Sequence, residues 1–183
     1  PIAESPHILA AGQTKSGKSV WLNSMLITML AHNTPETLKL AIVDPKKNEF
    51  IDYKGLAHNI ADPITDMKDA ETFIRYIEQL AEDRYRLFEK TNKRNIYRYN
   101  EWAKENGKEI LPFVVVLVDE WNNLRKQAKD IESPLEGLGE KARAAGLQLI
   151  VATQRPSADV LPGTIKANLP TKVSLKVDST INS

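Results

Sequence analysis

The sequence contains no cysteine among its 183 residues. A disulfide framework and a cysteine-ligated metal site are therefore both excluded. The sequence also lacks an uninterrupted apolar run of about 18 residues, which is the length that a membrane-spanning helix needs. Neither sign of charge is in excess, because 25 Lys and Arg residues face 24 Asp and Glu residues. The net charge of +1 argues against a monomer that binds nucleic acid mainly by electrostatic attraction, although a ring can still gather basic loops into a pore.

The residues that build a hydrophobic core are present in ordinary amounts. Apolar residues make up 42% of the chain and charged residues 27%. These proportions are typical of a folded soluble domain and argue against disorder. No signal-peptide pattern follows Pro1, so we expect a cytoplasmic protein. We expect a single domain over residues 1–183, which is either a fragment of a longer protein or a shortened version of one.

Short apolar segments alternate with helical patterns along the chain. Most of these segments are continuously apolar, as is typical of parallel strands that are covered on both faces. The last segment alternates between apolar and polar residues, which predicts an edge or half-exposed strand. The predicted strands are Ile8–Ala11, Lys39–Val43, Phe113–Val118, Leu147–Ala152 and Thr171–Val177. The pattern therefore predicts the α/β class, with a mostly parallel sheet and helices on both faces.

Three segments between the predicted strands carry the 3.6-residue periodicity of a helix. The first extends from about Lys18 to Ala31, and the second extends from about Asp66 to Lys90 with Thr65 as its expected N-cap. The third helix has sequence signals at both ends. Those signals are Ser133 as a capping residue, Pro134 at the first helical position, Glu136 to close a capping box, and Gly146 at the C-terminus.

A phosphate-binding pattern follows the first predicted strand. Residues 12–19 read GQTKSGKS and fit the pattern G-x-x-x-x-G-K-[ST]. A strand before such a loop and an amphipathic helix after it are the context that this motif requires. Backbone N–H groups of the loop wrap a polyphosphate, while Lys18 reaches the β- and γ-phosphates and the Ser19 hydroxyl reaches Mg²⁺. The nucleotide-binding residues predicted here are Gly12, Gln13, Thr14, Lys15, Ser16, Gly17, Lys18, Ser19 and Val20.

Two alternatives stay open for this loop. A glycine-rich turn that only opens a helix would give part of the same pattern. Lys15 adds a second positive charge, which either helps to hold phosphate or is simply solvated.

A pair of carboxylates follows the most apolar strand. Phe113–Val118 leads directly into Asp119 and Glu120, which is the Walker B arrangement. Ligands of open α/β sheets bind at the carboxyl ends of the strands, where both acids would project. We therefore expect Asp119 to hold the Mg²⁺ shell and Glu120 to orient and deprotonate the attacking water. The adjacent second carboxylate favours hydrolysis over simple nucleotide binding, although an acidic pair at the start of a helix is the ordinary alternative.

Two more polar residues lie just after apolar strands. We interpret Gln154 as a sensor that contacts the γ-phosphate or the attacking water. The alternative is an amide that satisfies the backbone of its own loop. Asp44 ends the second predicted strand, where it either supports the metal site or forms an ordinary strand-terminal turn.

Together these segments resemble the motor domain of the FtsK/SpoIIIE family. The resemblance covers nearly the whole chain, and its most family-specific part is the block from Lys141 to Ser157. The phosphate loop is less specific, because many unrelated families share it. The segments that carry the resemblance are Pro6–Val20, Asp44–Lys46, Arg94-Asn95, Tyr99-Asn100, Leu117–Glu120, Lys141–Ser157 and Ile165–Thr171.

The resemblance implies a RecA-like P-loop ATPase with ATP and Mg²⁺ as its cofactors. Members of this family assemble as a hexameric ring and pull double-stranded DNA through the pore. Their nucleotide lies at the subunit interface, where a neighbour supplies an arginine. Arg143 is our candidate for that arginine and Arg155 is the runner-up, whereas an ordinary surface position on a helix is the alternative for Arg143.

The chain departs from the family at several positions. Lys15 stands where the family usually has Gly, Trp121 where it usually has Phe, and Asn182 where it commonly has Asp. The family's DNA-facing loops, accessory domain, membrane anchor and winged-helix DNA reader lie outside this sequence, so a full-length parent anchored in a membrane is compatible with it. Conjugative coupling proteins and type VII secretion ATPases carry similar motors. DNA transfer in conjugation, protein export, and a nucleotide-binding module with little turnover therefore stay open as alternatives.

Overall fold

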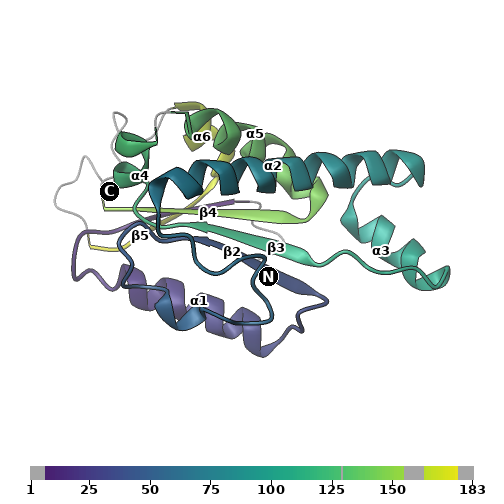
Figure 1. Ribbon diagram of the computed structural model, residues 1–183, viewed down its shortest axis with the longest axis horizontal. Coiled ribbons are helices and arrows are strands. Elements are labelled where there is room, and N and C mark those ends of the chain that lie inside the picture. Colours follow the sequence, from purple (N-terminus) through teal and green to yellow (C-terminus); the bar gives the residue numbers. More distant parts are fainter. Residues whose placement is uncertain (1–6, 129, 155–162, 177–183) are drawn as a thin grey trace.

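The computed structural model describes residues 7–128, 130–154 and 163–176. Within these ranges the chain forms one five-stranded sheet with the order β2-β3-β4-β1-β5 (Figure 1). Every pair of neighbouring strands is parallel. The strands are β1 (His7–Ala11), β2 (Leu38–Val43), β3 (Phe113–Val118), β4 (Leu147–Thr153) and β5 (Thr171–Ser174). The prediction of a parallel α/β sheet is confirmed.

Helices cover both faces of this sheet. Helix α1 lies on one face, and α2, α4, α5 and α6 lie on the other (Figure 1). Successive residues of β3 point to opposite faces, so Val116 packs in the cluster with α2 and α5 whereas Leu117 packs in the cluster with α1. The helices are α1 (Lys18–Ala31), α2 (Met67–Lys90), α3 (Ile96–Glu105), α4 (Trp121–Gln127), α5 (Glu132–Ala145) and α6 (Gly163–Asn168), with a short 3₁₀ helix at Ile51–Tyr53.

The edge position of the last strand is also confirmed. β5 pairs with β1 at one end of the sheet order, and its residues alternate between exposed and half-buried. The part of the predicted strand beyond Lys176 lies outside the described residues.

The N-terminal capping predictions for two helices are wrong, whereas Gly146 ends its helix in the left-handed conformation, as predicted. Asp66, and not Thr65, caps α2, because its carboxylate accepts a hydrogen bond from the backbone N–H of Lys68 at 2.8 Å. Helix α5 begins at Glu132, and no side chain caps it. The fully buried Ile131 precedes its first residue, so Ser133 and Pro134 lie within the first turn, further along the helix than predicted. Glu136 instead accepts a hydrogen bond from Thr164 of α6 and closes no capping box.

Helix α3 was not predicted as a helix, although its residues belong to the family-typical segments. Asn95 caps it by accepting a hydrogen bond from the backbone N–H of Arg98 at 3.1 Å. Asn100 then binds both backbone groups of Leu111, at 2.8 Å each, just before β3 begins. The two asparagines therefore define the helix and fix the chain that leads into the strand of the acidic pair.

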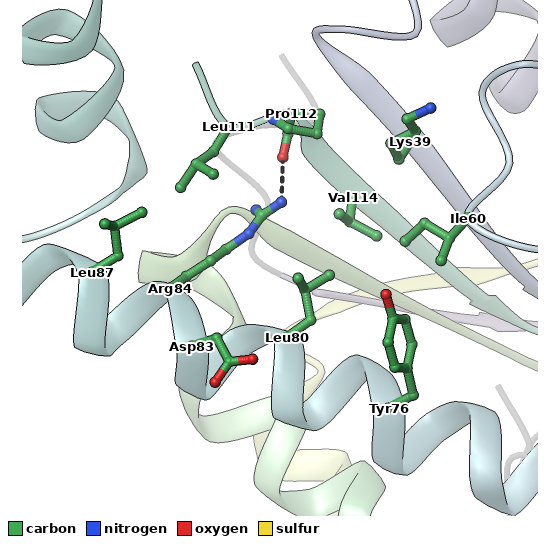
Figure 2. A pocket seen from close by; sticks show the side chains of 10 residues that line it. All are labelled: Lys39, Ile60, Tyr76, Leu80, Asp83, Arg84, Leu87, Leu111, Pro112 and Val114. Atoms are coloured by element: carbon green, nitrogen blue, oxygen red, sulfur yellow. Dashed lines mark hydrogen bonds between the residues drawn. The ribbon is translucent and has the colours of Figure 1, made fainter. Parts of the chain in front are cut away.

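A buried arginine joins three elements at the start of β3. Arg84 of α2 is 4% exposed and donates to the carbonyl oxygen of Ala145, at the end of α5, at 2.7 Å. It also donates to the carbonyl oxygen of Pro112 at 2.8 Å, as Figure 2 shows. Burial lowers the pKa of Arg84 to about 10. A positive charge at a helix C-terminus is favourable, so Arg84 anchors α2 to α5 and to the start of β3.

His7, the first residue of β1, is buried at 2% exposure. Its Nδ1 accepts a hydrogen bond from the backbone N–H of Leu149 at 3.0 Å, which leaves the proton of the neutral ring on Nε2. Burial is the largest cause of a pKa of about 4 for this ring; the backbone of Gly139 opposes the shift and the charge of Arg143 adds to it. The folded protein therefore holds His7 neutral.

We expect His7 to make the folded state less stable as the pH falls from about 6.5 to about 4. Over this interval His7 becomes protonated in the unfolded chain but stays neutral in the folded chain. The free energy of unfolding therefore decreases by up to about 3 kcal/mol. Urea unfolding at pH 7 and pH 4.5 measures the change. His7→Asn retains an acceptor for Leu149 but does not titrate, so its pH dependence should be flatter. Equal pH dependence in both proteins would contradict this account of His7.

Candidate nucleotide-binding site

A cavity of about 340 Å³ lies at the carboxyl edge of the sheet. The loops after β1 and β2 and the ends of β3 and β4 all contribute to it. The residues that line it are Gln13, Thr14, Lys15, Gly17, Lys18, Ser19, Val20, Lys46, Glu49, Asp119 and Gln154. The fold therefore brings together most of the phosphate loop, one residue of the acidic pair and the glutamine after β4, which the sequence placed far apart.

The two glycines of the phosphate loop are needed for different reasons. Gly17 has a φ of 90°, in the left-handed region, where it precedes the first residue of α1. At Gly12 the space is limiting, because a Cβ atom would collide with the Ser16 hydroxyl and lie 3.1 Å from the Cβ of Leu175. The loop is also closed by a hydrogen bond from the Ser16 N–H to the Gln13 carbonyl at 3.0 Å.

The structure gives a physical reason for the family's usual glycine at position 15. Lys15 has a φ of 64°, in the left-handed region. A residue with a side chain pays about 1–2 kcal/mol there, whereas glycine adopts this conformation readily. The Lys15 side chain is exposed and lines the cavity. Both alternatives, contact with phosphate and solvation, are compatible with this position.

Each carboxylate of the acidic pair contacts a different lysine. The buried Lys18 ammonium donates to Oδ1 of Asp119. The Lys46 ammonium donates to Oε2 of Glu120 at 2.8 Å. Burial lowers the pKa of Lys46, but the hydrogen bond to Glu120 and the surrounding carboxylates outweigh it and raise this pKa above its ordinary value. Sequence reasoning did not identify Lys46 as a site residue.

Glu120 occupies an unusual backbone position. Its φ of 49° and ψ of 55° are left-handed, and its carbonyl accepts hydrogen bonds from the N–H groups of Asn123 at 2.9 Å and Leu124 at 3.3 Å in α4. A non-glycine residue in this conformation stores about 1–3 kcal/mol of strain, which the surrounding structure has to offset. The chain therefore turns sharply between β3 and α4 with the acidic pair at the corner.

Of the two alternatives for Asp44, the structure shows the turn. Its carboxylate accepts hydrogen bonds from the backbone N–H groups of Lys46 at 3.1 Å, Glu49 at 3.1 Å and Phe50 at 3.2 Å. The side chain is buried and its two oxygens are occupied by these donors. Asp44 therefore shapes the loop that carries Lys46.

The donors at the cavity fit a magnesium ion bound together with a nucleotide. Ser19 and Asp119 line the same cavity, and their oxygens are the hard ligands that Mg²⁺ prefers. Across the described ranges no group of three or more His, Cys, Asp or Glu side chains could hold a metal on its own. A site with few protein ligands suits Mg²⁺, which usually keeps waters and takes phosphate oxygens as further ligands.

The two remaining predicted residues lie in different places. Gln154 lines the cavity beside the phosphate loop, as a sensor would. Arg143 lies exposed on α5 and acts electrostatically on His7, which begins β1, whereas the phosphate loop follows the other end of that strand. Arg143 is therefore not part of the cavity of its own chain. Arg155 lies outside the described residues.

In the described part of the chain, no helix combines the length and the apolar character needed to cross a membrane.

Comparisons with known proteins give consistent results. The sequence model of the FtsK/SpoIIIE family matches residues 2–158. A DNA translocase FtsK of Campylobacter jejuni is 49% identical over 179 residues, which cover 97% of this chain and 19% of that protein. The corresponding protein of Helicobacter pylori is 43% identical over 179 residues, covering 97% of this chain and 21% of that one. The chain thus spans about a fifth of the length of the curated relatives that it matches.

Solved structures show the same fold. The pCW3 conjugation coupling protein TcpA, in a monomer form with ATPγS, matches with a TM-score of 0.79 and 30% identity over 94% of this chain and 49% of that one. EssC (ATPases 2 and 3) from Geobacillus thermodenitrificans matches with a TM-score of 0.88 and 20% identity over 98% of this chain and 34% of that one, which supports the fold alone. The RecA-like P-loop prediction is confirmed, and the chain belongs to the FtsK/SpoIIIE family.

Proposed function

We propose that this chain is the ATP-hydrolysing core of a motor that moves double-stranded DNA. The observation that carries the proposal is the cavity that gathers Lys18, Asp119 and Gln154 beside the phosphate loop. Glu120 adds a second carboxylate through its contact with Lys46 at the wall of that cavity. A phosphate loop with a single acid would support nucleotide binding, whereas the second acid supplies a base for hydrolysis.

The proposed mechanism assigns one task to each of these side chains. Loop N–H groups and Lys18 neutralise charge on the β- and γ-phosphates, which requires the Lys18 ammonium to exchange Asp119 for phosphate oxygens. Ser19 and Asp119 hold Mg²⁺, which supplies further charge neutralisation when bound. Glu120 accepts the proton of the attacking water. Gln154 contacts the γ-phosphate or that water and reports hydrolysis.

We further propose that the complete site forms between subunits of a hexameric ring. Arg143 is exposed and remote from the cavity of its own chain, so it is available to a neighbouring subunit. An arginine that reaches the phosphates from a neighbour stabilises the charge that develops in the transition state. DNA is the proposed cargo because the similar curated proteins are DNA translocases.

Stimulation of ATP hydrolysis by DNA tests this proposal. Phosphate release is measured with Mg²⁺ at low salt, with and without linear duplex DNA. We expect the rate to rise with DNA and the stimulation to weaken as salt increases, because counterions compete for the phosphate backbone. A hydrolysis rate that is the same with and without DNA would favour the alternative of a protein-export motor. A third outcome is that the chain binds ATP without hydrolysing it and stays monomeric in size-exclusion chromatography with ATP and Mg²⁺. This outcome would favour a passive nucleotide-binding module.

A further inference from the structure

We propose that Lys46 positions the Glu120 carboxylate for activation of the attacking water. The inference rests on the proposed function, because it assigns Glu120 the role of base. Lys46 would act through Glu120 and would contact neither phosphate nor water, so it is a positioning residue. It comes from the loop after β2, and none of the motifs that locate the phosphates or the metal contains it.

The first support is the contact itself. The Glu120 side chain is 8% exposed, and its Oε2 accepts a hydrogen bond from the Lys46 ammonium at 2.8 Å. A buried carboxylate without a cation or hydrogen-bond donor is strongly disfavoured. Lys46 therefore gives this buried carboxylate a hydrogen-bond partner and fixes the direction in which it points.

The second support is that both partners are held by their own loops. Three backbone N–H groups bound to Asp44 fix the turn that carries Lys46. The left-handed backbone conformation of Glu120 fixes the turn that carries the carboxylate. A hydrogen bond of 3.0 Å from the Asp119 N–H to the Val43 carbonyl holds the ends of β3 and β2 together. A general base needs this kind of preorganisation, because a displacement of about 1 Å can cost on the order of 100-fold in rate.

The third support is the division of charge between the two acids. Lys18 contacts Asp119 and has to leave it for phosphate during the proposed reaction, whereas Lys46 contacts Glu120. If Lys18 were the partner of both carboxylates, both would lose it when nucleotide binds. With a lysine of its own, Glu120 keeps its orientation while Lys18 moves.

The test combines five variants, Glu120→Gln alone among them, and separates turnover from binding. Lys46→Met removes the donor, Lys46→Arg restores a cation, and Lys47→Met is the matched control because Lys47 is exposed and adjacent. Lys46→Met combined with Glu120→Gln completes a double-mutant cycle. Phosphate release gives kcat and KM, a fluorescent ATP analogue gives affinity, and thermal unfolding confirms that each variant is folded.

We expect Lys46→Met to lower kcat on the order of 10- to 100-fold with little change in KM or in analogue affinity. Lys46→Arg should recover most of this loss, and Lys47→Met should behave like the unmodified chain. In the Glu120→Gln background, Lys46→Met should cause no further loss, because its effect passes through the missing carboxylate.

Three results would overturn the inference while leaving the proposed role of Glu120 in place. Unchanged kcat in Lys46→Met would show that Glu120 needs no partner. A loss of ATP affinity in both backgrounds would make Lys46 a phosphate ligand instead. Additive losses in the double variant would separate Lys46 from Glu120. Equal hydrolysis by the unmodified chain and by Glu120→Gln would instead remove the proposed role of Glu120 itself, and the positioning role would fail with it.

Discussion

Replacing Glu120 by Gln is expected to leave ATP bound and to reduce its hydrolysis by a factor of about 10²–10⁴. Gln has the shape of Glu and still accepts a hydrogen bond from Lys46, so the corner between β3 and α4 should persist. The phosphate loop and Lys18 are untouched, which is why nucleotide affinity should survive. What is lost is the group that we propose takes a proton from water. Phosphate release in a single turnover, beside binding of a fluorescent ATP analogue, measures both properties.

The control for this experiment is another carboxylate changed in the same way. Glu89 is exposed near the end of α2 and does not line the cavity. Glu89→Gln should therefore hydrolyse ATP at the rate of the unmodified chain. If Glu120→Gln also kept that rate, Glu120 could not be the base, and the proposed division of roles within the acidic pair would be wrong.

Replacing Arg143 by Ala is expected to slow turnover by a factor of about 10³–10⁵, the usual effect of removing an arginine that reaches the phosphates from a neighbour. The side chain is exposed on α5, so its loss should change stability little. Arg86→Ala is a matched control, because Arg86 is also exposed on a helix and its ion pair, with Asp83 at 3.2 Å, lies on that same helix. The measurement is steady-state phosphate release at protein concentrations that allow assembly.

A mixing experiment decides whether Arg143 acts between subunits. Chains with Arg143→Ala retain Glu120, and chains with Glu120→Gln retain Arg143. When the two are mixed, some interfaces receive both intact groups, so part of the activity should return. Full activity of Arg143→Ala alone, or mixtures that stay inactive while both variants assemble, would leave Arg143 as an ordinary surface residue of α5.

The sequence predicts the parts of the site that depend on local chemistry. The phosphate loop is recognisable because its glycines meet local requirements, a left-handed φ at Gly17 and a close approach at Gly12. The strand before the acidic pair is recognisable because both of its faces are buried and all its residues are apolar. These features leave a pattern in consecutive residues, so no knowledge of the tertiary structure is needed to find them.

The contact between Lys46 and Glu120 depends on strand order. It exists because β2 lies beside β3 and their ends are in register, with Val43 opposite Val118. Seventy-four positions separate the two residues along the chain, so no spacing rule links them. A signal was present in Asp44, whose carboxylate shapes the loop that carries Lys46, but the sequence alone left its role open between the metal site and the turn.

The N-terminal caps of two helices were predicted less well than the strands and the phosphate loop. Ser133, Pro134 and Glu136 fit a capping box in sequence, yet the burial of Ile131 starts α5 earlier. At α2 the shift is a single residue, since Asp66 accepts the capping hydrogen bond in place of Thr65. A capping side chain contributes about 0.5–2 kcal/mol, whereas full burial of an isoleucine side chain contributes about 1.5–3 kcal/mol.

The rate of phosphate release from ATP by the unmodified chain tests the central claim most directly. The measurement compares Mg²⁺ with an excess of chelator, each with and without linear duplex DNA. Our account predicts release that requires Mg²⁺ and increases with DNA. ATP that stays bound and intact under every condition would contradict the claim that this cavity hydrolyses it.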